Sequence, residues 1–426
     1  MQPTALGKKN TYLLPLILVT SLFFLWAFLH NTNGILIPHL KKALQLSDTK
    51  SSFIDIAVYF GYFSIAIPAG YVMHKYGYKQ GIILGLFLFA CGALLFIPAA
   101  SAGSFALFLA ALYIQAAGAT FLETVANPYI TILGPKETSE RRLNFAQSFN
   151  GVGAVVAPII GGTFILSGVE YSQEQLNAMV PDQLSAYLHS EASTVKIPYL
   201  IIACVVLLVA VLFIFSKLPA VKESADADTH TGFSLKVLRH SHVRWAVIAQ
   251  FFYVGAQVGL ASFFIRFSKQ VMELPEKDAA YRWGYIAMVG FMVGRFFGTF
   301  LMKYIKPHRL LLLFSLFNIL LLIIALNTSG NMAVITVMAT PFFESIMFPT
   351  IFALGIKELG EETKMASSLL VMSIVGGALA PLLMGAISDS TGSMQKAYII
   401  PLLCFVVVAW YGWKGYKIKK VIHVPS

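Results

Sequence analysis

The chain has 426 residues, of which 57% are hydrophobic and only 12% are charged, and its mean hydropathy is +0.73. Soluble domains carry about 25% charged residues, so this composition excludes a soluble protein and predicts one that spans a membrane. The formal net charge of +11 does not indicate a nucleic-acid partner, because the basic residues are scattered between apolar segments instead of forming one stripe.

Twelve apolar runs are long enough to cross a bilayer, which requires roughly 20 residues per helix. In chain order we place them at 12–40, 50–75, 79–100, 104–134, 143–167, 196–217, 244–268, 281–304, 309–328, 331–357, 364–388 and 396–416. The first run has no small-residue cleavage site after it, so we interpret it as a membrane span and not as a signal peptide. The sequence therefore predicts an all-α membrane protein with twelve transmembrane helices.

The basic residues predict the direction in which the helices cross. Short loops make successive helices antiparallel, so the loops alternate between the two sides of the membrane. With both termini in the cytoplasm, about 21 of the 31 Lys and Arg residues fall inside and about nine outside, which is the bias of the positive-inside rule. The cysteines Cys91, Cys204 and Cys404 each lie within an apolar run and lack the spacing of a disulfide framework or metal site.

The two halves of the chain repeat each other. The matching segments are "FLETVANPYITILG" (121–134) with "FFESIMFPTIFALG" (342–355), and "NGVGAVVAPIIGG" (150–162) with "SIVGGALAPLLMG" (373–385). A nearly constant offset between such matches is typical of transporters built by duplication. We expect two pseudo-symmetric six-helix halves, 1–217 and 244–426, joined by a cytoplasmic linker, 218–243.

Each half carries a glutamate near the middle of its fourth helix, Glu123 and Glu344. An acid at the bilayer centre costs about 2.5–3.5 kcal/mol on insertion scales, so it must face a cavity or a counter-charge. Arg295 lies at a depth where it can neutralise Glu344, which is therefore either a structural ion-pair partner or a residue that couples transport to an ion. Glu123 has no basic residue at matching depth in its own half. We interpret it as a cavity carboxylate that binds and releases a proton, because burial disfavours the charged form.

Amide side chains and one tryptophan accompany Glu123. They are Trp26, Asn31, Asn33, Asn127, Gln147 and Asn150. An aromatic plane beside amides and a carboxylate suits a sugar, which offers a hydrophobic ring face and hydroxyl groups. A fully charged ligand would instead require a cationic clamp, for which Arg295 is the one deep cation in the sequence. A single amide can also serve only to cross-link two helices, but we interpret the set as a monosaccharide site.

Five segments carry a resemblance to a known family. They are "FFLWAFLHNTNGILIPHLKK", "YFGYFSIAIPAGYVMHKYGYKQGIILGL", "FLETVANPYITILGP", "RLNFAQSFNGVGA" and "RWAVIAQFFYVGAQ". These segments resemble the fucose/galactose/glucose:proton symporters of the major facilitator superfamily, over nearly the whole chain. The resemblance implies a two-domain carrier of the bacterial inner membrane that alternates between outward-open and inward-open states and moves a monosaccharide with a cation. It also implies that Glu123 is a protonation site and that Trp26, Asn31, Gln147 and Asn150 line the sugar cavity.

The chain departs from the fucose-transporting members of that family at two positions. Their first-helix N-x-N-D motif ends in an acid, whereas this chain has "NTNG" and thus Gly34, and their tenth-helix tyrosine is replaced by Phe348. Asp55, at a similar depth in the second helix, either replaces the missing acid or is an interfacial acid in contact with water. The identity of the sugar is therefore left open, as is the choice between proton and sodium, because carboxylates and amide carbonyls serve either ion.

We expect a secondary active transporter that imports a monosaccharide by proton symport as a functional monomer, with the lipid bilayer as its surroundings and without a cofactor or metal. Sodium-coupled uptake of a hexose or N-acetylhexosamine is one alternative. A non-sugar, drug-like carrier is another, and it predicts a wide apolar pocket instead of amides around Trp26. An enzyme would need a nucleophile with a base, or a metal cluster, and the sequence has neither spacing.

Overall fold

The computed structural model of the chain describes residues 13–44, 48–165, 178–216, 218 and 234–418. Every regular element in these ranges is a helix, so the prediction of an all-α protein is confirmed there. Ten stretches within them are long and apolar enough to cross a membrane, and a shorter apolar segment, Pro15–Phe28, lies in the first helix. Together with the fifth predicted span, which forms a helix of 27 residues, these account for the twelve predicted spans.

The first half contains seven described α-helices. They are α1 (Leu13–Ala43), α2 (Asp48–Tyr76), α3 (Tyr78–Ala102), α4 (Phe105–Ile132), α5 (Ser139–Ile165), α7 (Pro181–Ser193) and α8 (Lys196–Phe215), with a 3₁₀ turn η1 (Lys136–Thr138) before α5. Six of them are the predicted spans. The seventh, α7, was not predicted, and it lies on the loop that the sequence places outside the membrane.

The second half has more elements, because several of its spans are interrupted. They are η2 (Leu235–Arg239), α9 (Ser241–Met272), α10 (Glu276–Tyr281), η3 (Arg282–Ala287), α11 (Met288–Leu301), α12 (Pro307–Asn327), α13 (Gly330–Glu344), α14 (Met347–Gly355), η4 (Gly360–Glu362), α15 (Thr363–Met372), η5 (Ser373–Val375), α16 (Gly376–Thr391), α17 (Met394–Ala397), α18 (Ile399–Trp410) and η6 (Tyr411–Gly415). The tenth span is divided into α13 and α14, and the eleventh into α15, η5 and α16.

The break between α13 and α14 has a local cause. Pro349 has no N–H group, so the carbonyl oxygen of Ser345, four residues earlier, lacks its helical hydrogen-bond donor. A carbonyl left without a donor inside a membrane protein must find another partner. The guanidinium of Arg295 provides it, with a distance of 2.9 Å from Nε to the Ser345 oxygen.

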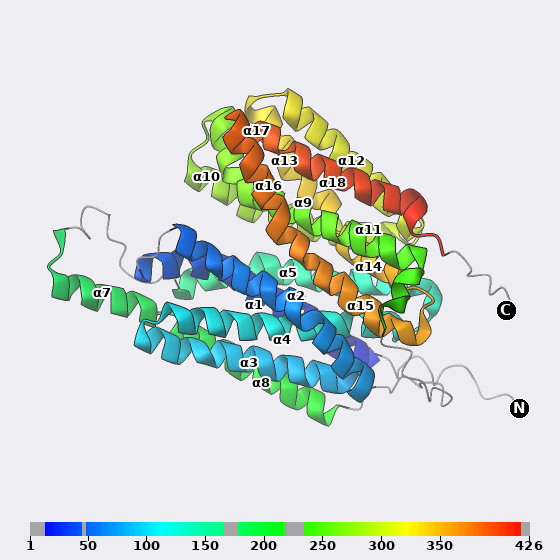
Figure 1. Cartoon of the computed structure of the whole chain (residues 1–426), viewed down its shortest axis with the longest axis horizontal. Helices are drawn as coiled ribbons and strands as arrows, with labels where there is room; N and C mark the ends of the chain where they lie inside the picture. The colour runs from blue at the N-terminus through cyan, green and yellow to red at the C-terminus, as the bar shows by residue number, and fades with distance from the viewer. Residues whose placement is uncertain (1–12, 45–47, 166–177, 217, 219–233, 419–426) are drawn as a thin grey trace, which may run out of the picture.

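The helices form two bundles (Figure 1). Helices α1 to α5, α7 and α8 make up one bundle and α9 to α18 the other, and the bundles come together at the end where α1 begins and α18 ends. Contacts between them involve α5 with α11 and α14, and α15 with α2 and α4. Most of the predicted linker lies outside the described residues, so its boundaries stay a prediction.

Glycines allow two pairs of helices to cross with their backbones in contact. A Cβ atom on Gly153 of α5 would lie 2.6 Å from the carbonyl oxygen of Phe24 in α1, and one on Gly376 of α16 would collide with the carbonyl of Phe251 in α9. Gly153 and Gly376 are equivalent in the internal repeat, since the offset between them is the one that relates 150–162 to 373–385. The fifth helix of each half thus packs on the first helix of that half in the same way.

Candidate functional site

Glu123 lies in the middle of α4 and is buried, with 9% of its surface exposed. The hydroxyl group of Tyr62, on α2, donates a hydrogen bond to its carboxylate. The second carboxylate oxygen, Oε2, has no hydrogen-bond partner among the described residues. The charge of Glu123 also interacts electrostatically with that of Arg295 on α11. Glu123 therefore has a counter-charge after all, supplied by the other bundle, although its own half offers none.

A chain of hydrogen bonds joins the predicted amide residues to Glu123. Arg295 donates from Nη1 to Oδ1 of Asn150 (2.9 Å) and to Oε1 of Gln147 (3.2 Å). Gln147 donates from Nε2 to Oδ1 of Asn127 (3.0 Å), and Asn127 donates from Nδ2 to the backbone carbonyl of Glu123 (2.8 Å). The structure thus brings four of the predicted site residues together, on α4 and α5.

Of the two alternatives for Glu344, the ion pair with Arg295 is not present, although the structure describes both side chains. Arg295 instead donates to Ser345 and to the backbone and side chain of Gln147, and its guanidinium lies 4.5 Å from the ring centre of Phe291. The physical reason is the break after α13, which leaves the Ser345 carbonyl free to accept. Glu344 is 2% exposed, and its Oε1 has no hydrogen-bond partner in the part of the chain that the structure describes. Its role in ion coupling stays a prediction.

The predicted aromatic residues are buried. Trp26 is 2% exposed and packs on Phe23, with 4.4 Å between ring centres, while its indole Nε1 finds no acceptor among the described residues. Phe348 is 8% exposed, and its ring lies 6.4 Å from that of Tyr253. Asn31 is half-buried and donates from Nδ2 to the carbonyl of Ala27 (2.7 Å), one turn earlier in its own helix. Asn33 and Gly34 lie on α1 and Asp55 lies on α2, but the surroundings of these three residues are outside what the structure describes, so their roles stay predictions.

Sequence reasoning missed three buried polar residues. Tyr62 lies in an aromatic-rich span. The sequence there does not distinguish a tyrosine whose hydroxyl contacts an acid from one whose ring faces lipid. Gln250 and Tyr253 lie one turn apart on α9, and the amide atoms of Gln250 and the hydroxyl of Tyr253 have no hydrogen-bond partner among the described residues. Gln250 is fully buried. A glutamine inside an apolar run was the signal that could have found it, because an unpaired amide is costly there.

Polar contacts join the bundles at the end where they meet, which we call the closed end. Asn144 on α5 donates from Nδ2 to Oγ1 of Thr350 on α14 (3.2 Å), and Nζ of Lys357 lies 2.7 Å from Oε1 of Glu140. The side chain of Glu140 is 5% exposed and that of Lys357 is 40% exposed. The carboxylate is therefore buried, and Lys357 is its salt-bridge partner, while its other oxygen accepts from the hydroxyl of Ser139 (3.0 Å).

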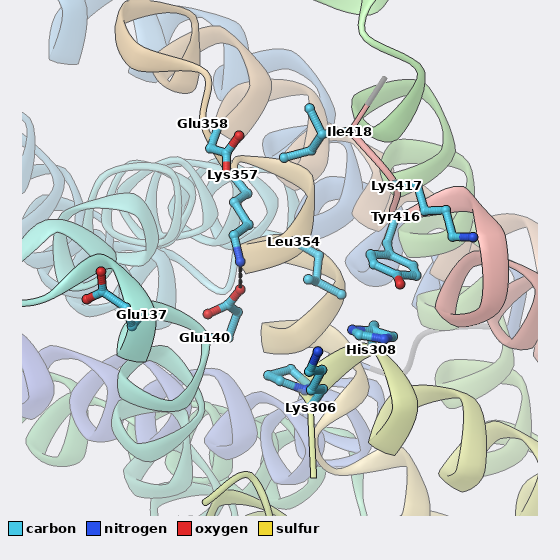
Figure 2. A pocket seen from close by; sticks show the side chains of 11 residues that line it. Glu137, Glu140, Lys306, His308, Leu354, Lys357, Glu358, Tyr416, Lys417 and Ile418 are labelled. Atoms are coloured by element: carbon cyan, nitrogen blue, oxygen red, sulfur yellow. Dashed lines mark hydrogen bonds and ion pairs between the residues drawn. The ribbon is translucent and has the colours of Figure 1, made fainter. Parts of the chain in front are cut away.

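Figure 2 shows a pocket at the closed end, with Lys357 directed at Glu140 on one wall. Its volume is about 660 Å³. The six charged residues that line it are Glu137, Glu140, Glu358, Lys306, Lys357 and Lys417. His308 and Tyr416 also line it, with their rings stacked 4.1 Å apart. None of the predicted site residues lines this pocket, so it is distinct from the amide chain around Glu123.

We expect the pair Glu140–Lys357 to show strong coupling in a double-mutant cycle. Lys357→Gln alone removes the salt-bridge partner of a buried carboxylate and should lower the melting temperature of the purified protein, whereas Glu140→Gln with Lys357→Gln should restore most of the loss. The interaction energy from thermal unfolding of the four variants should fall between about 0.5 and 3 kcal/mol. Additive effects of the two substitutions would mean that the pair does not hold the closed end together.

Comparison with known proteins covers nearly the whole chain. A family model described as Major Facilitator Superfamily matches residues 17–374. The chain is 45% identical over 409 residues to the L-fucose-proton symporter of Escherichia coli (strain K12), covering 94% of this chain and 93% of that protein. It is 39% identical over 422 residues to the glucose/galactose transporter of Brucella abortus (strain 2308), covering 97% of each.

Solved structures agree with the sequence relatives. The crystal structure of the E. coli fucose:proton symporter matches with a TM-score of 0.88 and 43% identity, covering 95% of this chain and 99% of that one. A structure of a major facilitator superfamily transporter in the outward conformation also matches with a TM-score of 0.88, at 44% identity, covering 94% of this chain and 98% of the other. The proton:xylose symporter matches with a TM-score of 0.70 at 14% identity, covering 95% and 96% of the two chains, which is a likeness of fold alone.

Proposed function

The chain belongs to the Major Facilitator Superfamily, and we propose that it is a secondary active transporter that imports a monosaccharide together with a proton. One observation carries the proposal: Glu123 is in contact with both ends of the amide network. Its backbone carbonyl accepts from Asn127 at one end of the hydrogen-bonded chain, and its buried carboxylate interacts electrostatically with Arg295, which donates to Gln147 and Asn150 at the other. A titratable group and hydroxyl-binding groups in one network are what a symporter needs, because binding of the sugar and binding of the ion must influence each other.

The substrate that fits this chemistry is a neutral monosaccharide of the fucose, glucose and galactose class. The amides supply donors and acceptors for hydroxyl groups. Arg295 donates its hydrogen bonds to the carbonyl of Ser345 and to the amides of Gln147 and Asn150, so it offers no clamp for a charged ligand. The relatives support the class, since one is named a fucose-proton symporter and another a glucose/galactose transporter.

A proton is the coupling ion that the site supports best. One oxygen of Glu123 accepts from Tyr62, and the other is without a partner among the described residues, so a proton bound there needs no further ligand. A metal cation would require several oxygen ligands around it.

Transport follows from a rocking motion of the two bundles about the site. The positive-inside rule assigns the closed end, with Glu140 and Lys357, to the cytoplasm together with both termini. The structure then corresponds to a carrier that is closed toward the cytoplasm. We propose that it works as a monomer in the bacterial inner membrane and needs no cofactor.

A test of the function uses the purified protein in proteoliposomes. Labelled fucose, glucose, galactose, xylose and N-acetylglucosamine are offered under an imposed pH gradient or an imposed sodium gradient, one at a time. We expect at least one hexose or 6-deoxyhexose to accumulate with the inward proton gradient and to leak out when a protonophore is added. Accumulation that follows sodium and ignores pH would replace the proton with sodium, and no uptake of any sugar would overturn the proposal.

A further inference from the structure

Arg295 belongs to the second bundle but makes most of its hydrogen bonds to the first. It is 4% exposed, and it donates to the backbone oxygen of Gln147, to Oε1 of Gln147 and to Oδ1 of Asn150. We propose that Arg295 is a positioning residue that orients the sugar-binding amides of α5 only while the bundles meet at the closed end, so that the two faces of the carrier differ in sugar affinity. This inference rests on the proposed sugar transport.

The guanidinium fixes which atom of each amide faces it. An asparagine or glutamine amide can be turned with either its oxygen or its NH₂ group toward a neighbour, but arginine has five N–H donors and no acceptor. Arg295 therefore requires the oxygens of Asn150 and Gln147. Gln147 then donates from Nε2 to Asn127, so both the oxygen and the NH₂ group of the Gln147 amide are engaged. Asn150 keeps its Nδ2 as a donor that is not used by any described residue, and we assign that donor to an oxygen atom of the sugar.

The position of Arg295 depends on the second bundle. Its Nε is held by the carbonyl of Ser345, which Pro349 leaves without a helical donor, and its guanidinium lies over the ring of Phe291. When the bundles separate at the closed end, these contacts keep the arginine with α11 and α13, away from α5. The amides of Asn150 and Gln147 then lose the group that orients them. A sugar bound from that side has to order them itself, which weakens binding.

The first test measures affinity at each face. Apparent Km values for entry and exit are determined by exchange at equal pH on both sides, in right-side-out and inside-out vesicles. For the wild type we expect a lower Km at the outer face. Arg295→Gln should raise the outer Km about tenfold, as expected for a lost hydrogen bond to a charged group, and leave the inner Km unchanged. Arg266→Gln is the matched control, because Arg266 is an exposed arginine on α9 of the same bundle.

The comparison of the Km values at the two faces distinguishes a positioning role of Arg295 from a general loss of folded protein. A general loss of folded protein lowers the maximal rate at both faces and does not change the ratio of the two Km values. Equal Km changes at both faces in Arg295→Gln, or no change at either, would overturn the inference while leaving sugar transport intact. Absence of sugar uptake by the wild type would overturn the proposed function itself, so the two failures are distinguishable.

A second pair of variants tests the orientation of Asn150 even where Arg295→Gln does not fold. Asn150→Asp keeps an oxygen for Arg295 but replaces the free NH₂ donor with an acceptor, and it is nearly the same size. We expect Asn150→Asp to lose sugar affinity as fully as Asn150→Ala, while its thermal stability stays at least that of Asn150→Ala. Wild-type affinity in Asn150→Asp together with loss in Asn150→Ala would mean that the oxygen faces the sugar, which contradicts the inference.

Discussion

Glu123→Gln should abolish proton-driven sugar accumulation and leave downhill exchange of the sugar intact. Glutamine has the shape of the protonated acid and can still accept from Tyr62, but it cannot ionise, so one of the two states that couple proton to sugar is removed. A charged carboxylate is costly to carry through a closed, dehydrated intermediate, so the neutral variant should change conformation in both directions. The measurement compares accumulation under an imposed pH gradient with counterflow exchange at equal pH, in the same proteoliposomes.

Glu137→Gln is the matched control for this experiment. Glu137 is an exposed acid in η1 near the closed end, so its removal changes the net charge by the same amount without altering the buried network. We expect it to accumulate sugar like the wild type. If Glu123→Gln also accumulated sugar in proportion to the imposed pH gradient, Glu123 would not be the coupling site. Loss of both accumulation and exchange would instead indicate that the carboxylate binds the sugar directly.

Gly376→Ala should destabilise the protein more than any other single-methyl change in α16. The new Cβ would collide with the backbone carbonyl of Phe251, and a backbone cannot move aside as a flexible side chain does. Overpacking in a well-packed interior typically costs about 1–3 kcal/mol, and a clash between two backbones belongs at the upper end of that range. We expect a large drop in melting temperature and poor recovery of monodisperse protein, measured by thermal unfolding and size-exclusion chromatography.

Gly385→Ala serves as the control on the same helix. A Cβ there would meet only the end of the Phe263 ring, at 3.9 Å, which is an ordinary contact. Alanine is favoured over glycine in a helix by up to about 1 kcal/mol, so this variant should be as stable as the wild type or slightly more so. Equal melting temperatures for the two variants would show that α16 and α9 are not held in backbone contact.

The sequence was sufficient to predict the spans and the buried acid, for a physical reason. A helix that crosses a bilayer must be long and apolar, and an acid within it is conspicuous, so Glu123 and the repeat around it could be recognised without any structure. The amides Asn127, Gln147 and Asn150 were recognised for the same reason. Polar groups in a membrane interior have few alternatives to a shared network.

The partners of Arg295 could not be predicted in this way. Depth along a helix placed Arg295 level with Glu344, but hydrogen bonding depends on which faces of α5, α11 and α13 meet. It also depends on the carbonyl of Ser345, which Pro349 leaves without a helical donor at the break between α13 and α14. The pattern of apolar residues does not predict where that break lies. The orientation of Asn150 follows from these contacts and so lies beyond sequence reasoning as well.

The hydrogen bonds that Arg295 makes from the second bundle to the first also show how the two halves of the chain have diverged since the duplication. The segment "HKYGYK" (74–79) at the end of α2 corresponds to "MKYIKP" (302–307) after α11, an offset of 228, and at that offset the counterpart of Arg295 is Ile67. Both halves therefore keep a buried glutamate, but the amides of the network lie in the first half and the cation that orients them lies in the second. A chimera assembled from two copies of the first half would possess two sets of amides and no arginine at the position of Arg295, and it should be unable to discriminate between the faces of the membrane.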